Sequence, residues 1–257
     1  MTETAQYAPG TPSWVDLGSP DLAASKAFYG ELFGWEAQVA PESEAGGYTM
    51  FLFHGKAVAG LGPLMQPNQP PAWTTYVSID DANATIAKVR AAGGAVVVEP
   101  MSVLQAGRMA IFTDPTGAYL SIWEPGEHGG AEVVNQPNSL SWNELATRDI
   151  ETAKTFYQAV FGWESVTHPA EMIGSYNEFQ LGGKSIAGGM QMTDQFPPQV
   201  PAHWLPYFTV EDCDATVSRA QELGARLSAG PMDIPQGRFA VIGDPQGAVF
   251  AVISLPS

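Results

Sequence analysis

The sequence predicts an α+β protein built from four βαβββ units, each a strand, a helix and three further strands. Two observations support this prediction. The second half of the chain repeats the first, and a helix that begins at Asp and ends at Gly recurs within the halves at a constant spacing. With 257 residues, the chain is long enough for two domains that each bury a core of their own.

A shift of 128 residues aligns the two halves of the chain. Nine of the first 22 aligned positions are identical, where ordinary residue frequencies give about one or two. The identical pairs are Trp14 and Trp142, Leu17 and Leu145, Asp21 and Asp149, Lys26 and Lys154, Phe28 and Phe156, Tyr29 and Tyr157, Phe33 and Phe161, Gly34 and Gly162, and Trp35 and Trp163.

Near the end of each half, a shift of 130 aligns Asp114-Pro115-Thr116-Gly117 with Asp244-Pro245-Gln246-Gly247. The whole chain is therefore a duplication. We expect one domain over residues 11–125, a linker rich in Gly, Pro and Asn over 126–138, and a second domain over 139–255.

The helices are predicted from an Asp and a Gly that lie 13 residues apart, at Asp21 to Gly34, Asp81 to Gly94 and Asp149 to Gly162. In the first of them, Ser19-Pro20 is expected to supply the N-cap and a first-turn proline, and Gly34 to end the helix. Its expected apolar stripe is Ala24, Phe28 and Leu32. A strand at Trp14 to Leu17 precedes it, and strands near Trp35 to Ala40, Tyr48 to Phe53 and Ala57 to Met65 follow, before the order restarts at Ala72.

Composition excludes several classes of function. The formal net charge is −16, which repels nucleic acid and anionic lipid surfaces. The sequence contains neither a signal-peptide pattern at its start nor an apolar run long enough for a membrane helix, so a cytoplasmic protein is expected. The single cysteine, Cys213, follows Glu211 and Asp212, which disfavour a thiolate, and it is predicted to be inert.

The four units, the Phe-Tyr and Phe-Gly-Trp motifs on the first helix of each half, and the Asp-Pro-x-Gly turn before the last strand resemble the vicinal oxygen chelate superfamily. This superfamily includes glyoxalase I, bleomycin-resistance proteins and extradiol dioxygenases. The chain is most similar to its tandem actinobacterial members, some of which are connected with antibiotic biosynthesis. The resemblance implies tandem glyoxalase-like domains, in which two units curl their sheets into one cup, so the chain is expected to form two cup-shaped mixed sheets.

The resemblance also implies four metal-ligand positions per half, and here they do not carry ligands. They fall on Trp14, Thr74 and Ser121 in the first half, on Trp142, Leu205 and Ala251 in the second, and near Gly60 and Gly188. Indole nitrogen only donates hydrogen bonds, and glycine has no side chain. We therefore expect neither a metal nor another cofactor. A displaced site could use Asp16 or Glu144 with His203, but two ligands are fewer than the three or four of a zinc or iron site.

Strand periodicity places Asp16 and Glu144 on the same faces as the two tryptophans. They are the candidate proton acceptors or ligand anchors, and the alternative is structural pairing with Arg108 and Arg238. The residues expected to bind a substrate are Trp14, Thr74, Tyr76, Ser121 and Trp123 in the first cup and Trp142, His203, Leu205 and Tyr207 in the second. The first cup is the expected working one, because the second has Ile253 in place of Trp123.

The leading hypothesis is a protein of the antibiotic-resistance type that binds or sequesters a small aromatic or hydrophobic natural product without a metal. The alternative is a glyoxalase-like lyase or isomerase, or a hydroxylase-type enzyme of secondary metabolism, with Asp16 or Glu144 as base. A third hypothesis is a scaffold whose cups are filled by side chains. The expected partner is a small molecule, with no nucleic acid and no membrane, and the chain is expected to be a monomer or a homodimer.

Overall fold

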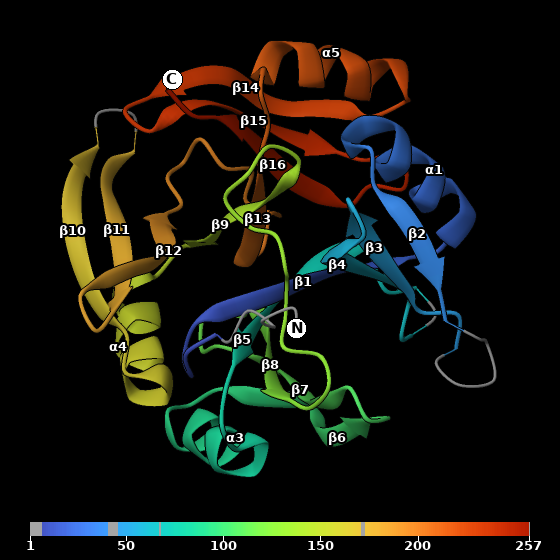
Figure 1. The fold of residues 1–257 in the computed structure, drawn as a ribbon. Coiled ribbons are helices and arrows are strands. Elements are labelled where there is room, and N and C mark those ends of the chain that lie inside the picture. The colour runs from blue at the N-terminus through green and yellow to red at the C-terminus, as the bar shows by residue number, and fades with distance from the viewer. Residues whose placement is uncertain (1–6, 41–45, 67, 171–172, 257) are drawn as a thin grey trace. The chain divides into compact units, whose positions relative to one another are not determined.

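The computed structural model describes residues 7–40, 46–66, 68–170 and 173–256. Its strands form two eight-stranded mixed sheets with the same strand order, and helices pack on one face of the strands (Figure 1). The first sheet has the order β2 (Glu36–Val39), β3 (Thr49–Phe53), β4 (Lys56–Pro63), β1 (Pro12–Ser19), β5 (Ala72–Ser78), β8 (Tyr119–Pro125), β7 (Gly107–Thr113) and β6 (Ala95–Val103).

The second sheet repeats this order with the strands of the second half. It runs β10 (Glu164–Ala170), β11 (Gly174–Leu181), β12 (Lys184–Gln191), β9 (Ser139–Thr147), β13 (His203–Thr209), β16 (Val249–Ser254), β15 (Gly237–Gly243) and β14 (Arg226–Ile234). In both sheets the strand before a helix pairs in parallel with the last strand of its unit, and the other pairs within a unit are antiparallel. The predicted α+β class and the four βαβββ units are confirmed.

Among the described residues each βαβββ unit has one helix, and an aspartate caps the N-terminus of each. The helices are α1 (Leu22–Phe33), α3 (Ala82–Ala91), α4 (Ile150–Phe161) and α5 (Cys213–Glu222). The four capping carboxylates, of Asp21, Asp81, Asp149 and Asp212, each accept a hydrogen bond from the backbone N–H three residues later. Helices α1 and α4 end at glycines in the left-handed conformation, at Gly34 and Gly162.

Three details predicted for α1 are wrong: the N-cap, the first-turn proline, since Pro20 lies before the helix, and the apolar stripe. The N-cap is Asp21 and not Ser19, because Asp21 has the extended backbone of a cap and its Oδ1 lies 2.9 Å from the nitrogen of Ala24. The hydroxyl of Ser19 instead accepts a hydrogen bond from the nitrogen of Asp21. The buried face is also rotated from the predicted stripe: Phe28 is buried, but its buried companions are Ser25, Tyr29 and Phe33, while Ala24 and Leu32 are only partly buried.

The chain divides into two compact units, and each combines segments from both sequence repeats. One unit contains Thr75–Gly130 and Trp142–Leu205 with the segment that leads to Ser13, and the other contains Trp14–Thr74, Ala131–Ser141 and Pro206–Ser257. In the first unit α3 packs against α4, and in the second α1 packs against α5 (Figure 1). The domain boundaries at residues 125 and 139 describe the sequence repeat and stay a prediction, because the compact units combine segments from both repeats.

A buried tyrosine joins the two repeats inside each compact unit. The hydroxyl of Tyr157, on α4, donates to Asp114 Oδ2 at 2.8 Å and accepts from the indole nitrogen of Trp204 at 2.9 Å. Asp114 is the first residue of the Asp-Pro-x-Gly turn of the other repeat, and its Oδ1 also accepts from the backbone nitrogens of Thr116 and Ala118. The tyrosine therefore fixes a helix of one repeat to a turn of the other.

The other compact unit makes the same contacts with the repeats exchanged. Tyr29 donates to Asp244 Oδ2 at 2.9 Å and accepts from Trp73 at 3.1 Å. The tryptophan that follows each of these helices also donates a hydrogen bond to a distant segment. Trp35 donates to the carbonyl of Asn138, and Trp163 donates to the carbonyl of Gly10. Each repeat thus supplies a tyrosine donor to a carboxylate of the other, and the two tryptophans donate to carbonyls in the segments beside the repeats.

We predict that Tyr157→Phe and Tyr29→Phe each destabilise the fold. Removal of the hydroxyl leaves a buried indole N–H and a buried carboxylate oxygen without their hydrogen bonds, at a cost of about 1–3 kcal/mol per group. Urea unfolding should show a lower midpoint with an unchanged slope. Tyr119→Phe, at a side chain that is 59% exposed, is the control and should unfold like the wild type. Equal midpoints for all four proteins would show that the tyrosine bonds add nothing.

Candidate functional site

Each sheet has one face that packs against the helices and forms the core, and an opposite, helix-free face. Successive side chains along a strand point to these two faces in turn. On β1, Val15 and Leu17 are fully buried in the core beneath α1, so Trp14 and Asp16 lie on the helix-free face. On β9, Leu145 belongs to the core beneath α4, so Glu144 lies on the opposite face, as does Trp142. As predicted, each carboxylate therefore lies on the same strand face as the tryptophan two residues before it.

Trp14, Tyr48 and Asp16 form a hydrogen-bonded cluster on this face. The indole nitrogen of Trp14 donates to the hydroxyl of Tyr48 at 3.2 Å, and that hydroxyl donates to Asp16 Oδ2 at 3.4 Å. Gly60 lies beside Asp16 in the parallel pairing of β1 and β4. A Cβ atom at Gly60 would lie only 1.8 Å from the tyrosine hydroxyl, so the absence of a side chain there makes room for the phenol.

Trp142, Tyr176 and Glu144 form the equivalent cluster in the second repeat. The indole nitrogen of Trp142 donates to the hydroxyl of Tyr176 at 2.8 Å. Glu144 is 8% exposed and forms a side-chain hydrogen bond with the same phenol. Gly188 pairs with Glu144, and a Cβ at Gly188 would again lie 1.8 Å from the tyrosine hydroxyl. Two copies of one arrangement, each made possible by a glycine, indicate that the arrangement was already present in the unit that was duplicated.

The sequence analysis missed both tyrosines, although the repeat contained the signal for them. The same shift of 128 that pairs Trp14 with Trp142 also pairs Tyr48 with Tyr176. Tyr48 lies just before β3, at the exit of a turn that contains Gly46 and Gly47, where strand periodicity does not fix the direction of a side chain. An alignment of each candidate position with its counterpart in the other repeat finds the pair.

Burial keeps the two phenols protonated. It raises the pKa of Tyr48 well above 10, and the negative charge of Asp16 raises the pKa further. The pKa of Tyr176 is also raised, first by burial and then by the charge of Glu144. Both hydroxyls therefore act as neutral hydrogen-bond donors near neutral pH.

The remaining predicted site residues also lie on helix-free faces. Tyr76 and Ser121 are paired in register on β5 and β8, and the rings of Tyr76 and Trp123 meet edge to face with centroids 6.4 Å apart. The hydroxyl of Ser121 is buried and has no hydrogen-bond partner among the residues that the structure describes. Thr74 alternates with the core residue Trp73, and His203, Leu205 and Tyr207 alternate with the core residues Trp204 and Phe208.

Trp123, Tyr207 and His203 each contact a different neighbouring residue. Trp123 donates to the carbonyl of His128 at 2.8 Å, and the ring of Tyr207 lies 6.0 Å from that of Phe239. His203 has its Nδ1 at 2.9 Å from the carbonyl oxygen of Pro201. His128 and Phe239 were not among the residues predicted from sequence, and only their contacts with Trp123 and Tyr207 reveal them.

The clusters do not provide the ligands that a divalent metal needs. Trp14 and Trp142 donate only, and a metal-bound tyrosine is a phenolate, which the raised pKa values oppose. One carboxylate per cluster remains. Over the described part of the chain, no three His, Cys, Asp or Glu residues gather in a way that could hold a metal ion. The donor set therefore does not fit the metal site of metal-dependent relatives.

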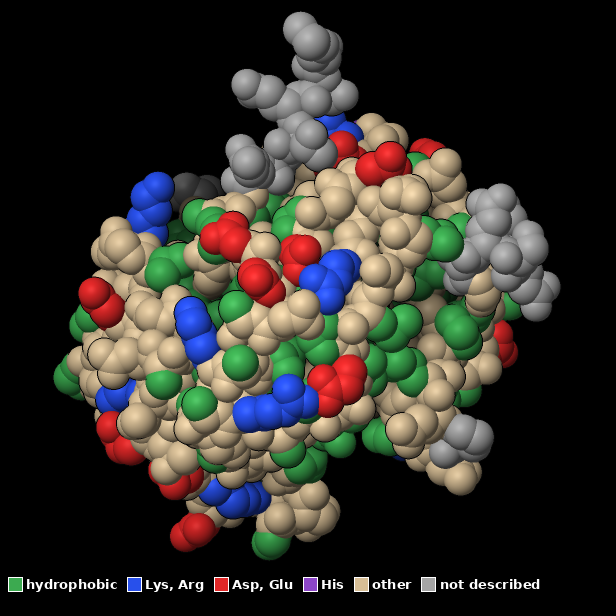
Figure 2. Space-filling model, turned by 90° about the horizontal axis from the view of Figure 1, so that it is seen from below, with side chains coloured by type: hydrophobic (Ala, Val, Ile, Leu, Met, Phe, Trp, Pro, Cys, Tyr) green, Lys and Arg blue, Asp and Glu red, His purple; other side chains and the backbone are tan. Residues whose placement is uncertain are grey.

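The predicted alternative, in which Asp16 and Glu144 pair with Arg108 and Arg238, is wrong. Both arginines pair with other carboxylates. Arg108 binds Glu124 at 3.0 Å. Arg238 binds Asp214 and Asp233, and its pKa is raised by these contacts. Figure 2 likewise shows Lys and Arg side chains lying singly among Asp and Glu side chains on one face of the molecule. Of the helices that the structure describes, none has the length and apolar character to cross a membrane.

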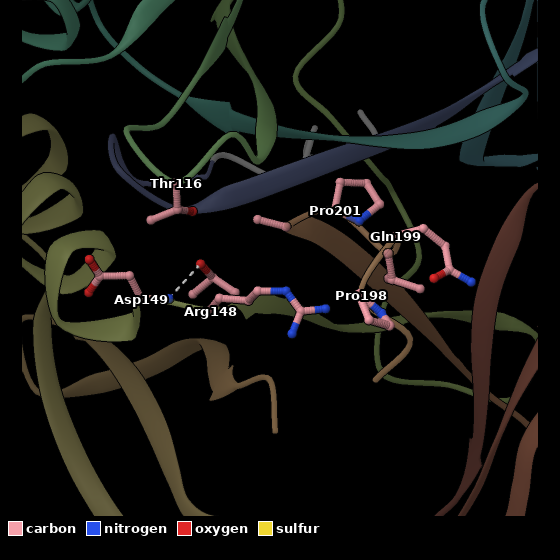
Figure 3. Close-up of a pocket in the computed structure, with 9 residues that line it drawn as sticks. Thr116, Arg148, Asp149, Pro198, Gln199 and Pro201 are labelled. Atoms are coloured by element: carbon pink, nitrogen blue, oxygen red, sulfur yellow. Dashed lines mark hydrogen bonds between the residues drawn. The ribbon is translucent and has the colours of Figure 1, made fainter. Parts of the chain in front are cut away.

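A hollow of about 430 Å³ lies elsewhere, at the N-terminus of α4 (Figure 3). Thr116, Thr147, Arg148, Asp149 and the segment from Pro198 to Ala202 line it. Arg148 is exposed and donates to the carbonyl of Pro197 at 3.0 Å, while Asp149 caps the helix. Its charged groups thus have structural partners, and the Trp–Tyr–carboxylate clusters are the stronger candidate site.

Comparison with known proteins identifies the family. Residues 11–122 match the family described as Glyoxalase/Bleomycin resistance protein/Dioxygenase superfamily, and residues 143–253 match the glyoxalase-like domain. The chain belongs to this superfamily. It is 41% identical to CFP32 of Mycobacterium bovis over 98% of both chains. It is 42% identical to the anthracycline biosynthesis protein DauV of Streptomyces sp. over 97% of this chain and 95% of DauV.

Solved structures of the superfamily share the fold. The Mn(II)-bound glyoxalase from Novosphingobium aromaticivorans aligns with a TM-score of 0.66 at 18% identity, over 96% of this chain and 82% of the glyoxalase. The 2,3-dioxygenase LapB from Pseudomonas sp. KL28 aligns with a TM-score of 0.65 at 13% identity, over 98% of this chain and 96% of LapB. At these identities the likeness concerns the fold alone.

The raised tyrosine pKa values predict the behaviour of the protein at alkaline pH. Free tyrosine side chains lose their proton near pH 10, whereas Tyr29, Tyr48, Tyr157 and Tyr176 retain theirs above that pH in the folded state. Their contribution to stability is complete below about pH 10 and is lost as the pH rises above it. Phenolate absorbance should therefore show a late step that coincides with unfolding by circular dichroism.

Tyr48→Phe should remove one proton from that late step and leave the earlier titration unchanged. If the wild type instead released all its tyrosine protons near pH 10 while still folded, the assignment of these hydroxyls as persistently neutral donors would be wrong.

Proposed function

We propose that this protein binds a small, flat aromatic or hydrophobic natural product on the helix-free faces of its sheets, through its Trp–Tyr–carboxylate clusters and without a metal ion. The observation that supports the proposal most is that Trp14 and Trp142 occupy positions that the family resemblance assigns to metal ligands. Their partners Tyr48 and Tyr176 occupy the space above Gly60 and Gly188. An aromatic surface with a polar group at its edge replaces the site of a hydrated ion.

Such a surface suits a ligand that is mostly apolar and carries a few polar groups. Indole and phenol rings offer large rigid faces for stacking, and the carboxylate beside them fixes the orientation of the ligand. The buried hydroxyl of Ser121 is a further polar group on a helix-free face that a ligand could satisfy.

The names of two relatives support this class of ligand. DauV and DnrV, both 42% identical to this chain, are named anthracycline biosynthesis proteins. Anthracyclines are polycyclic aromatic compounds, and stacking on a tryptophan is one way in which a protein can hold such a ring system. We therefore propose a compound of that general kind as the ligand of this chain.

We predict that the purified protein carries no stoichiometric Zn, Ni, Fe or Mn. The cluster residues supply one carboxylate and a neutral phenol where a site for such ions uses three or four ligands. Elemental analysis of protein prepared without chelator measures this directly. About one ion per repeat that survives dialysis against a chelator would contradict the metal-free proposal.

A neutral polycyclic quinone such as anthraquinone should bind the wild type and quench its tryptophan fluorescence. Stacking contributes about 0.5–1.5 kcal/mol beyond area burial, so Trp14→Ala and Trp142→Ala should weaken binding about two- to ten-fold in whichever cluster is used. Titration calorimetry measures the affinity.

Trp14→Phe and Trp142→Phe are the matched controls, because they keep a smaller aromatic face while they lose the indole N–H and its five-membered ring. They should bind more tightly than the alanine variants, and thermal unfolding should show that all variants are folded. The proposal is abandoned if no quinone binds the wild type, or if both alanine variants fold normally and bind as the wild type does.

A further inference from the structure

The direction of the hydrogen bonds in each cluster restricts the polar group that a ligand can present. In the first cluster Trp14 donates to Tyr48, and Tyr48 donates to Asp16, so the carboxylate is the final acceptor. In the second, Trp142 donates to Tyr176, which is hydrogen-bonded to Glu144. An indole N–H and a protonated phenol both use their hydrogen within the cluster, whereas an ionised carboxylate has about four lone-pair directions. A ligand that meets the carboxylate must therefore supply an N–H or O–H donor.

The charge of the cluster selects further among donors. Asp16 and Glu144 each place a negative charge beside a phenol, as the raised tyrosine pKa values record. The formal net charge of the whole chain is −16. An anionic ligand is repelled by both, whereas a cationic ligand is attracted by both.

The aromatic rings favour a cation as well. A positive charge over the face of a tryptophan or tyrosine is attracted by the ring quadrupole, most strongly for tryptophan. Each cluster joins one tryptophan, one tyrosine and one carboxylate through hydrogen bonds, so a carboxylate and two aromatic rings lie next to one another. Charge-assisted hydrogen bonds are about twice as strong as neutral ones.

We propose that the ligand is an aromatic cation, a flat ring system that carries a protonated amine, and that the amine binds Asp16 or Glu144 while the ring lies against Trp14 or Trp142. This inference rests on the proposed function, and it adds the charge and the donor group of the ligand. The carboxylates act as anchors of the amine, and no bond of the ligand is broken.

Three probes with one ring system separate the inference from the proposed function. Anthracenylmethylamine is cationic, anthracenylmethanol is neutral, and anthracene carboxylate is anionic at neutral pH. Calorimetry at low salt should show the amine binding at least about ten-fold more tightly than the alcohol, with the carboxylate weakest. Added salt should weaken the binding of the amine and leave that of the alcohol unchanged.

Asp16→Asn and Glu144→Gln test the anchors. The variant at the working cluster should bind the amine much less tightly, and only about as tightly as it binds the alcohol, because the amide oxygen still accepts a hydrogen bond from either probe but carries no charge. Asp233→Asn and Glu99→Gln are the matched controls, since they remove one carboxylate charge at exposed ion pairs with Arg238 and Arg90. These controls should leave the affinities for all three probes unchanged.

The outcomes are distinguishable. Equal binding of the three probes to the wild type overturns the inference and leaves the proposed aromatic binding standing. Tight binding of the amine that neither Asp16→Asn nor Glu144→Gln weakens also overturns it. If none of the three probes binds, the proposed function fails and the inference fails with it. The comparison of probes uses the wild type, so it holds even if a substituted protein does not fold.

Discussion

The fold depends on a buried hydrogen bond between a tyrosine of one repeat and an aspartate of the other. Tyr157 binds Asp114, and Tyr29 binds Asp244, so each first helix is held by a turn that lies far away in the sequence. An unpaired carboxylate in a core is costly, and the tyrosine hydroxyl together with the backbone N–H groups of the turn satisfies it. The duplication therefore produced two repeats that complete each other inside each compact unit, and neither core is formed by one repeat alone.

This arrangement fixes the position of the candidate site. Packing of Val15 and Leu17 beneath α1 and of Leu145 beneath α4 commits one face of β1 and β9 to the core, and the period of two then places Trp14, Asp16, Trp142 and Glu144 on the other face. Gly60 and Gly188 leave the space that Tyr48 and Tyr176 fill. The same framework that positions metal ligands in some relatives thus presents a neutral phenol between an indole and a carboxylate.

The side chains on the helix-free face decide which ligands the candidate site can attract. A divalent ion would attract anionic oxygen atoms, whereas a carboxylate beside two aromatic rings attracts N–H and O–H donors and positive charge. The superfamily fold is compatible with either, because the chemistry belongs to the few side chains on the helix-free face and not to the sheets that carry them. Membership of the family follows from the comparisons, whereas the ligand class is a separate proposal that rests on these side chains.

The sequence by itself determined the duplication, the four βαβββ units and the faces of β1, β9 and β13, because identical residues at a constant shift and the period of two are local properties of a chain. It also placed Trp14 with Asp16, and Trp142 with Glu144, on one face of their strands. Only the tertiary structure decided that Tyr48 and Tyr176 join them, that Arg108 and Arg238 bind other carboxylates, and that the repeats exchange their tyrosine–aspartate bonds. These contacts join residues that are distant in sequence, and no local pattern states which distant partner a side chain will meet.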